Sequence, residues 1–408
     1  MKRKACVVVA SEMTLRTFLV AQLVAMQARY DVTVVVNTTN PALLEDLGVS
    51  ARLRPLPIER AIAPLCDLRC LASLVRLMRT ERFDLVHSMT PKAGLLAMIA
   101  ARIARVPVRI HTFTGQVWAT RTGIARAALR WLDKMLARTA TFVLADSQSQ
   151  RAFLASERVV SASKIAVLAN GSVSGVDATR FRPDPVRRRV IRESLGIPMT
   201  DVVLLFVGRI NRDKGVMDLA RAFAILADRR ADIRVLVVGP DEEGLTRAIH
   251  DVCSRHLARL HFCAYTNAPE DFMTASDILC LPSYREGFGT VIIEAAAAGL
   301  PAVASRIYGL VDAVVDGETG LLHEPADFDG LAGQLERLIS SPELRRSLGA
   351  AARVRAARDF SQPTITSAVL DVYSRLLDVA PRNQTAASAR AAQIAEASFL
   401  VETQGGTK

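Results

Sequence analysis

The chain has 408 residues, half of them apolar and 5% aromatic, which is enough for two or three globular domains. No stretch reaches the ~18 apolar residues of a membrane-spanning helix, and the basic, apolar start (MKRKACVVVASE) is too short for a secretory signal. The six cysteines form no CxxC pair and the histidines show no ligand spacing, which argues against a disulfide framework and a metal site. We therefore expect a cytoplasmic protein.

The positive charge is confined to the first half of the chain. Residues 1–195 contain 30 Lys and Arg and 14 Asp and Glu, whereas residues 196–408 contain 22 and 27. A basic half beside a mildly acidic half indicates a polyanionic partner for the first half only. Nucleic acid, an anionic membrane surface and a phosphorylated lipid all fit this charge.

The first half alternates apolar, β-branched runs with helical segments. We expect strands at ACVVVA, DVTVVV, FDLVHS, PVRIHTF and TFVLA, and helices at residues 14–29, 67–80, 91–104 and 119–138. Continuous apolar strands separated by helices are typical of a parallel sheet covered on both faces. The pattern predicts a doubly wound α/β domain over residues 1–182.

A second domain of the same kind follows a proline-rich, basic segment at 183–199, which we interpret as a linker. Over residues 200–361 we expect strands at DVVLLFVGR, IRVLVVGP, RLHFCAY, DILCLP and PAVAS, with helical sequence at 328–358. A further helix at 362–380 is expected to return to the first domain, and 381–408 to form a flexible tail. The predicted fold is α/β, with two Rossmann-like domains facing across a cleft.

Two cations follow the first strand of the second domain, in VGRINRDKG. Arg209 comes directly after the strand and Lys214 lies just before the next helix. Because free N–H groups at a helix start and cationic side chains both favour anions, this loop is a candidate phosphate site. The alternative is a solvated surface loop.

Two carboxylates lie eight residues apart in SYREGFGTVIIEAAAAGLPAVAS. Glu286 precedes a predicted helix and Glu294 lies inside it, with glycines between them. An ionised carboxylate only accepts hydrogen bonds, so both suit hydroxyl-rich groups such as a sugar and a ribose, while the upstream cations suit phosphates. Alternatively, Glu286 favours the helix dipole and Glu294 is solvated. No strand is followed by G-x-G-x-x-G or a Walker loop, which argues against a dinucleotide oxidoreductase and a P-loop NTPase.

The combination of GRxxxxKG, E-G-F-G-x-x-x-x-E and the continuation AAAAGLPAVAS resembles the retaining, nucleotide-sugar-dependent glycosyltransferases of family 4, which have the GT-B fold. Similar stretches (DLVHSMTPKAG, RIHTFTG, VLANGSVSGVDATRF and VDGETGLL) resemble the branch that builds capsule, O-antigen and lipid-linked glycans. The resemblance covers nearly the whole chain. It implies that residues 200–361 bind the donor and that residues 1–182 bind the acceptor.

The resemblance also implies roles for individual residues. Arg209 and Lys214 would bind the donor diphosphate and stabilise the leaving nucleotide. Glu286 would contact the hydroxyls of the transferred sugar and Glu294 the ribose. The remaining donor-binding candidates lie between these two acids: Gly287, Phe288, Gly289 and Thr290. No metal and no cofactor beyond the donor would be needed, and we expect that donor to be UDP-linked.

Two stretches depart from the family pattern. Where many relatives have a histidine before a glycine, this chain has Thr114 before Gly115, with His111 nearby. Either His111 has a catalytic role or Thr114 lines the site, and the alternative for His111 is a buried structural histidine. A glycine pair after the first strand is replaced by Ser11–Thr14. Three residues are therefore candidates for the acceptor loop: Ser11, Thr14 and Thr114.

The helix expected at 119–138 is amphipathic. One face is apolar: Ile124, Ala128, Trp131, Leu132 and Met135. Another is basic: Arg126, Arg130, Lys134 and Arg138. Such a helix either buries its apolar face against the sheet or lies in a membrane interface. With the basic first half, it favours peripheral attachment to the inner face of the cytoplasmic membrane, where an undecaprenyl-diphosphate-linked saccharide would be the acceptor.

Other functions remain open at this point. A sugar-nucleotide epimerase also combines two Rossmann-like domains with a bound diphosphate, and transfer to an acceptor would distinguish the two. A non-enzymatic polyanion-binding protein would explain the basic half. No aromatic residues are interleaved with the arginines as a stacking platform, which argues against nucleic acid as a partner. A glycoside hydrolase would use two carboxylates but leave Arg209 and Lys214 without a role.

Overall fold

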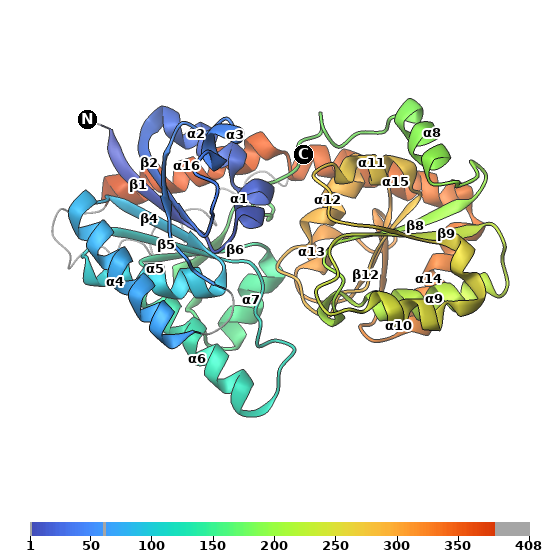
Figure 1. The fold of residues 1–408 in the computed structure, drawn as a ribbon, viewed down its shortest axis with the longest axis horizontal. Helices are drawn as coiled ribbons and strands as arrows, with labels where there is room; N and C mark the ends of the chain where they lie inside the picture. The colour runs from blue at the N-terminus through green and yellow to red at the C-terminus, as the bar shows by residue number, and fades with distance from the viewer. Residues whose placement is uncertain (1, 60–62, 380–408) are drawn as a thin grey trace, which may run out of the picture. The chain divides into compact units, whose positions relative to one another are not determined.

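The structure is a computed structural model that describes residues 2–59 and 63–379. It contains two α/β units, each built on one parallel sheet (Figure 1). Unit 1 comprises the chain up to Ser174 and again from Gln362, and unit 2 comprises Gly175–Ser361. The predicted flexible tail at 381–408 lies outside the described residues.

Seven parallel strands form the sheet of unit 1, in the order β3-β2-β1-β4-β5-β6-β7. Most of their side chains are buried, as expected for strands covered on both faces. The two edge strands, β3 and β7, are three or four residues long and were not predicted. The strands are β1 Arg3–Val8, β2 Tyr30–Val36, β3 Arg52–Pro55, β4 Leu85–Met89, β5 Val108–Phe113, β6 Phe142–Ala145 and β7 Ile165–Val167.

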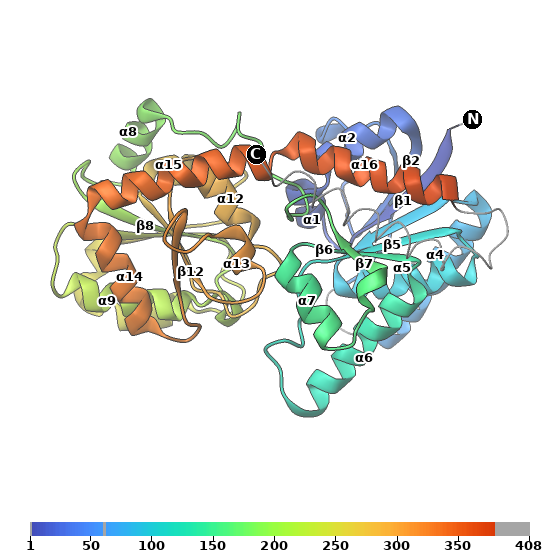
Figure 2. The ribbon, with the colours of Figure 1, turned by 180° about the vertical axis from the view of Figure 1, so that it is seen from behind.

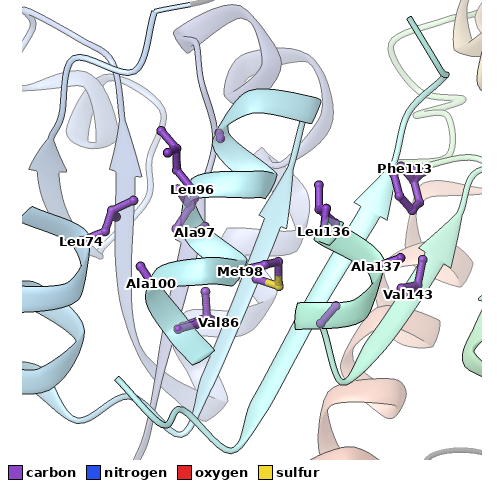
Figure 3. Close-up of a cluster of buried hydrophobic side chains, with 14 of the residues drawn as sticks. Leu74, Val86, Leu96, Ala97, Met98, Ala100, Phe113, Leu136, Ala137 and Val143 are labelled. Carbon is purple, nitrogen blue, oxygen red and sulfur yellow. The ribbon is translucent and has the colours of Figure 1, made fainter. Parts of the chain in front are cut away.

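Helices cover both faces of this sheet. On one face lie α1 Glu12–Phe18, α2 Val20–Arg29, α3 Leu43–Asp46 and the C-terminal α16 Gln362–Val379 (Figure 1). On the other lie α4 Pro64–Glu81, α5 Pro91–Ile103, α6 Gly123–Thr139 and α7 Gln148–Ser156. Figure 3 shows the second core, where side chains of α4, α5 and α6 meet the sheet.

The C-terminal helix α16 is part of unit 1. Its Tyr373 is fully buried, and its hydroxyl forms a hydrogen bond with His87 Nδ1 of β4. The ring of Tyr373 also packs edge-on against Tyr30 of β2, with centroids 6.2 Å apart. An apolar helix face therefore attaches the end of the described chain to the first sheet.

Six parallel strands form the sheet of unit 2, in the order β10-β9-β8-β11-β12-β13. Both faces carry an apolar core. The last strand, at one edge, is four residues long and was not predicted. The strands are β8 Val202–Val207, β9 Ile233–Val238, β10 Leu260–Cys263, β11 Ile278–Leu281, β12 Ala302–Ser305 and β13 Gly320–His323.

The helices of unit 2 also lie on both faces of its sheet. One core is completed by α11 Pro269–Ala275, α12 Thr290–Ala297, α13 Leu310–Ala313 and α15 Pro342–Asp359. The other is completed by α9 Val216–Ala227, α10 Thr246–Val252 and α14 Phe328–Ser340. The helical sequence predicted at 328–358 is two helices, because Ser341 has extended backbone dihedrals and caps α15.

The segment predicted as a linker, 183–199, is instead integrated into unit 2. It forms α8, Pro185–Ser194, which packs against α11. Arg192 of α8 has no exposed surface, and its guanidinium donates to Asp277 Oδ2 at 2.7 Å and to the carbonyl of Ala275 at 2.8 Å. Prolines and charge are typical of linkers, but here Pro185 starts a helix and a buried Arg anchors it.

No helix within residues 2–59 and 63–379 is long and apolar enough to cross a membrane.

Candidate active site

The motifs of the second domain meet at a topological switch point. Strand β8 lies between β9 and β11, so the connections after β8 and β11 leave in opposite directions. Ligands of open parallel sheets bind outside the carboxyl ends of the strands at such a point. Arg209–Lys214 follow β8 and Ser283–Gly289 follow β11, so the structure brings the two predicted motifs to one edge of the sheet.

Gly215 allows the two loops to approach each other. Its φ is +67°, in the left-handed region, and a Cβ at this position would lie 1.8 Å from the carbonyl oxygen of Pro282. Only glycine combines that conformation with so close a backbone contact. The loop after β8 is thereby pressed onto the residues that follow β11.

Three polar contacts then hold the loops together. The backbone N–H of Tyr284 donates to the carbonyl of Asp213 at 2.9 Å. The guanidinium of Arg285 donates to Asp213 Oδ2 at 2.7 Å. The third contact is an ion pair between Lys214 Nζ and Glu286 Oε1, the cation and the carboxylate that sequence reasoning assigned to phosphate and sugar.

Glu286 has a second partner on the same oxygen. The hydroxyl of Ser283 donates to Glu286 Oε1 at 2.9 Å. Both side chains of the Lys214–Glu286 pair are mostly shielded, with 19% and 12% of their surfaces exposed. Among the described residues no hydrogen bond to the other oxygen of Glu286 is formed, so Oε2 can accept one from a ligand.

Arg209 pairs with a carboxylate that sequence reasoning missed. Its guanidinium donates to Glu242 Oε2 at 2.8 Å, and Asn211 Nδ2 donates to the same oxygen at 3.2 Å. The side chain of Asn211 also accepts from the backbone N–H of Lys214 at 3.1 Å. Glu242 follows β9 in VVGPDEE, so the rule that functional residues follow strand ends would have found it.

Glu294 lies in the second turn of α12, in a largely apolar environment. Desolvation raises the pKa of Glu294 to about 7, against the opposing attraction of Arg180. Arg180 itself donates to Glu270 Oε2 at 2.8 Å. Glu294 keeps intermediate exposure, so the raised pKa reflects partial removal from water and argues against a purely solvated role.

Phe288 was expected beside the donor phosphates, but its side chain belongs to the core. It is 2% exposed and packs against Phe360 with ring centroids 5.1 Å apart. Gly289, with φ +77°, turns the chain into α12, and Thr290 is its first residue. No side chain caps this helix start, so backbone N–H groups at Thr290 and after it can bind an anion.

His111 is a structural histidine of unit 1. It is 1% exposed, its Nδ1 is 2.9 Å from Ser88 Oγ, and its ring packs on Phe113. A Cβ on Gly94 would lie 2.3 Å from the ring, so α5 closes over it. Burial lowers the pKa of His111 to about 3. The enclosed ring favours the alternative of a buried structural histidine, and a catalytic role for His111 stays an untested prediction.

The three acceptor-loop candidates lie at the carboxyl edge of the first sheet. Ser11 caps α1, and its Oγ is 3.0 Å from Thr14 Oγ1 and 3.3 Å from the backbone nitrogen of Thr14. These contacts give both side chains a structural role. Thr114 follows β5 and is half-buried, so it stays a candidate.

Chemically, the edge of the second sheet offers cations beside carboxylate acceptors. Lys214 and Arg209 supply positive charge, α12 supplies backbone donors, and Glu286 supplies an acceptor. Within the described part of the chain, no cluster of three or more His, Cys, Asp or Glu is arranged as a metal site. Independence of a metal stays a prediction.

Family comparisons match both units. The family model described as "Glycosyl transferases group 1" matches residues 187–355. The model described as "Glycosyl transferase 4-like domain" matches residues 15–171.

Named relatives are similar over most of their length. The capsular polysaccharide biosynthesis glycosyltransferase CapM of Staphylococcus aureus is 31% identical over 325 residues, which are 79% of this chain and 84% of CapM. The UDP-Gal:alpha-D-GlcNAc-diphosphoundecaprenol alpha-1,3-galactosyltransferase of Escherichia coli is 28% identical over 321 residues, 78% of this chain and 82% of that enzyme.

A solved structure shares the fold. HepE of Anabaena, crystallised in complex with UDP and glucose, aligns with a TM-score of 0.78 at 22% identity, over 91% of this chain and 99% of HepE.

Proposed function

The chain belongs to the group 1 glycosyl transferases and has the GT-B fold, and from this membership we propose that it transfers a sugar, with retention, from a UDP-linked donor to an undecaprenyl-diphosphate-linked saccharide. The product would be a surface polysaccharide or a related lipid-linked glycan. The epimerase and the non-enzymatic polyanion-binding protein receive no support from the relatives.

The observation that carries the proposal is the Lys214–Glu286 pair at the switch point of unit 2. A nucleotide-sugar joins an anionic diphosphate directly to a hydroxyl-rich ring. A cation and a carboxylate in contact match these two chemistries side by side. During transfer the bond between the sugar C1 and the phosphate oxygen breaks, and the ammonium of Lys214 would neutralise the charge that develops on that oxygen.

Arg209 and Glu294 extend the proposed donor site in two directions. Arg209 would leave Glu242 for the diphosphate, assisted by the N-terminal N–H groups of α12. Glu294 would accept hydrogen bonds from the ribose. With Arg209 and Lys214 neutralising the phosphates, transfer needs neither a metal nor a further cofactor.

The choice of UDP follows the relatives. The Escherichia coli enzyme uses UDP-Gal, and HepE was crystallised with UDP. We extend that nucleotide to this chain, with a hexose or an N-acetylhexosamine as the transferred sugar.

The acceptor and the location rest on related arguments. The Escherichia coli relative acts on a diphosphoundecaprenol-linked sugar, and a lipid carrier is accessible only at a membrane surface. The basic first half of the chain is suited to the anionic inner face of the cytoplasmic membrane. We therefore place the enzyme there as a peripheral protein, with no nucleic-acid partner.

Release of free nucleotide tests the proposal. The full chain is incubated with UDP- and GDP-sugars and bacterial lipid extract, with and without EDTA. We expect release from a UDP-sugar that requires the lipid fraction and survives EDTA, and NMR of the product should show the anomeric configuration of the donor. Lys214→Ala and Glu286→Ala should each lower the rate ~10²–10³-fold, the usual cost of losing a charged transition-state partner.

Matched variants control for charge and folding. Arg229 and Glu193 are exposed in unit 2, so Arg229→Ala and Glu193→Ala should retain the wild-type rate. Release that proceeds without any acceptor lipid, or an inverted product, would overturn the corresponding part of the proposal.

A further inference from the structure

The first half of α6 exposes its apolar residues. Ile124 is 89% exposed and Trp131 is 56% exposed, and Ala127 and Ala128 between them are exposed too. Positions 124, 127, 128 and 131 recur at helical spacing, so they form one stripe. A helix that crosses over a sheet normally buries such a stripe against it.

The buried part of α6 lies elsewhere. Its buried residues all belong to the second half of the helix: Asp133, Leu136, Ala137 and Thr139. Figure 3 shows Leu136 and Ala137 in the core beneath the helix. The first half continues beyond the sheet (Figure 2). The alternative that this face is buried against the sheet therefore holds only in part, because Leu132 and Met135 are half-buried while Ile124, Ala128 and Trp131 are exposed.

A second helix of the same layer exposes apolar residues in its first turns. Leu65 and Leu68 of α4 are 77% and 63% exposed. The helix between them, α5, packs against both α4 and α6. Leu65 and Leu68 on one side and Ile124 and Trp131 on the other therefore belong to one face of unit 1, which we call the outer apolar rim.

The outer apolar rim lies at the ligand-binding edge of the sheet. In a parallel α/β unit each crossover helix starts at the carboxyl edge of the strands and runs back along them. All four rim residues lie in the first halves of their helices. They are therefore at the same edge as Thr114, the remaining candidate for acceptor contact.

The layer of unit 1 that carries the rim is strongly positive. Residues 64–139 contain 13 Lys and Arg but only 4 Asp and Glu. Of the four acids, Asp133 is buried and Asp67 pairs with Lys92. Glu157, which follows α7, pairs with Arg126 and Arg130 of α6, so these two arginines are partly neutralised. Arg69 on α4 and Arg121 before α6 are exposed beside the rim.

We propose that the outer apolar rim of α4 and α6 docks on an anionic lipid bilayer, with Trp131, Ile124, Leu65 and Leu68 inserted into the interface. An apolar stripe bordered by Arg and Lys, with Trp at the boundary, has the chemistry of an interfacial helix. This surface deepens the proposed function, since it brings the acceptor edge of unit 1 to the layer that holds a lipid-linked saccharide.

A bilayer fits the rim better than a second copy of the chain does. Two copies would place like charges from both basic layers against each other, which opposes association. An anionic surface instead attracts each basic residue, by about fivefold in affinity per residue.

Vesicle flotation tests the docking surface without relying on catalysis. The full chain is mixed with phosphatidylcholine vesicles that contain or lack phosphatidylglycerol. We expect binding to the anionic vesicles, loss of most of it at high salt, and a blue shift of Trp131 emission that is absent in Trp131→Phe. Ile124→Glu/Trp131→Glu and Leu65→Glu/Leu68→Glu should each weaken binding at least ~tenfold.

Controls separate this surface from the catalytic proposal. Val354 is 65% exposed on α15 of unit 2, so Val354→Glu should bind vesicles like the wild type. The Ile124→Glu/Trp131→Glu variant should keep its activity on a short-chain, water-soluble acceptor and lose activity on acceptor embedded in vesicles. If neither the wild type nor any variant consumes a donor, the catalytic proposal fails. The flotation result still shows whether the outer apolar rim binds anionic vesicles. Equal vesicle binding by wild type and both double variants would overturn the docking surface, as would self-association that only these variants abolish.

Discussion

The ammonium group of Lys214 and the carboxylate of Glu286 form an ion pair although 72 residues separate them in the chain. The contact exists because their loops follow the neighbouring strands β8 and β11 and because Gly215 lets those loops touch. A donor that enters this site would separate the two charges, because its diphosphate would bind Lys214 and its sugar hydroxyls would bind Glu286.

The coupling of this pair is measurable. Lys214→Met and Glu286→Gln should each reduce kcat/KM, because each removes one donor contact and leaves a shielded charge with less compensation. In the double variant the loss should be smaller than the sum of the two by about 1–3 kcal/mol, as for residues in direct contact. Nucleotide release by the wild type, the two single variants and the double variant checks this prediction. Strictly additive losses would show that the two residues act independently.

Gly215 should be one of the least replaceable glycines of unit 2. In Gly215→Ala the new Cβ meets the Pro282 carbonyl and the residue keeps an unfavourable positive φ, so we expect a loss of roughly 3 kcal/mol or more in the free energy of unfolding. Gly244 is the matched control, because it has the same φ of +67° with no atom within 4 Å. Gly244→Ala should cost only about 1 kcal/mol. Urea titration measures the free energy of unfolding of both variants. Equal losses would mean that the contact with the Pro282 carbonyl does not make Gly215 harder to replace.

Donor binding should depend on pH through Glu294. Desolvation raises its pKa to about 7, so in the unliganded protein the carboxylate is mostly protonated at pH 6 and mostly ionised at pH 8. Only the ionised form is a pure acceptor for ribose hydroxyls, so the KM for the donor should fall as the pH rises from 6 to 8. Glu294→Gln should raise the KM and flatten this profile. A wild-type KM that is constant over this range would contradict the assigned role.

Asp133 should make the stability of unit 1 depend on pH. Burial raises the pKa of Asp133 to about 6, above the usual value for Asp, while the Trp118 indole donates to its Oδ2 at 2.7 Å. Between about pH 4 and 6 the folded state holds a proton that the unfolded state has lost, so stability falls as the pH rises through this window. The loss levels off only well above pH 6 and is on the order of 3 kcal/mol.

Asp133→Asn separates the charge from the hydrogen bond. The amide oxygen of Asn can still accept from Trp118, so this variant should be more stable than the wild type at pH 8 and lose the slope between pH 4 and 6. Asp133→Ala should be less stable than Asp133→Asn, because the buried indole N–H then has no acceptor. Thermal unfolding at several pH values measures all three proteins, and identical pH profiles of wild type and Asp133→Asn would refute the assignment.

The sequence by itself determined the two doubly wound units and the two loops that we propose as the donor site. Runs such as DVTVVV and DVVLLFVGR are apolar on both faces, which only a strand covered from both sides satisfies, and functional residues follow such strands. Arg209 and Glu286 were predicted in this way, and the structure places them after the neighbouring strands β8 and β11. The edge strands β3 (RLRP) and β13 (GLLH) escaped because neither contains a run of apolar residues long enough to predict a strand.

The tertiary structure alone decided which side chains meet and which are enclosed. Nothing local distinguishes Phe288, which packs on Phe360 of a distant segment, from an aromatic residue that faces a ligand. Likewise, the burial of His111 depends on Gly94 closing over it from α5, and the exposure of Trp131 depends on where α6 leaves the sheet. Periodicity shows that a helix has an apolar face, but whether that face meets a sheet or remains uncovered is set by the geometry of its neighbours.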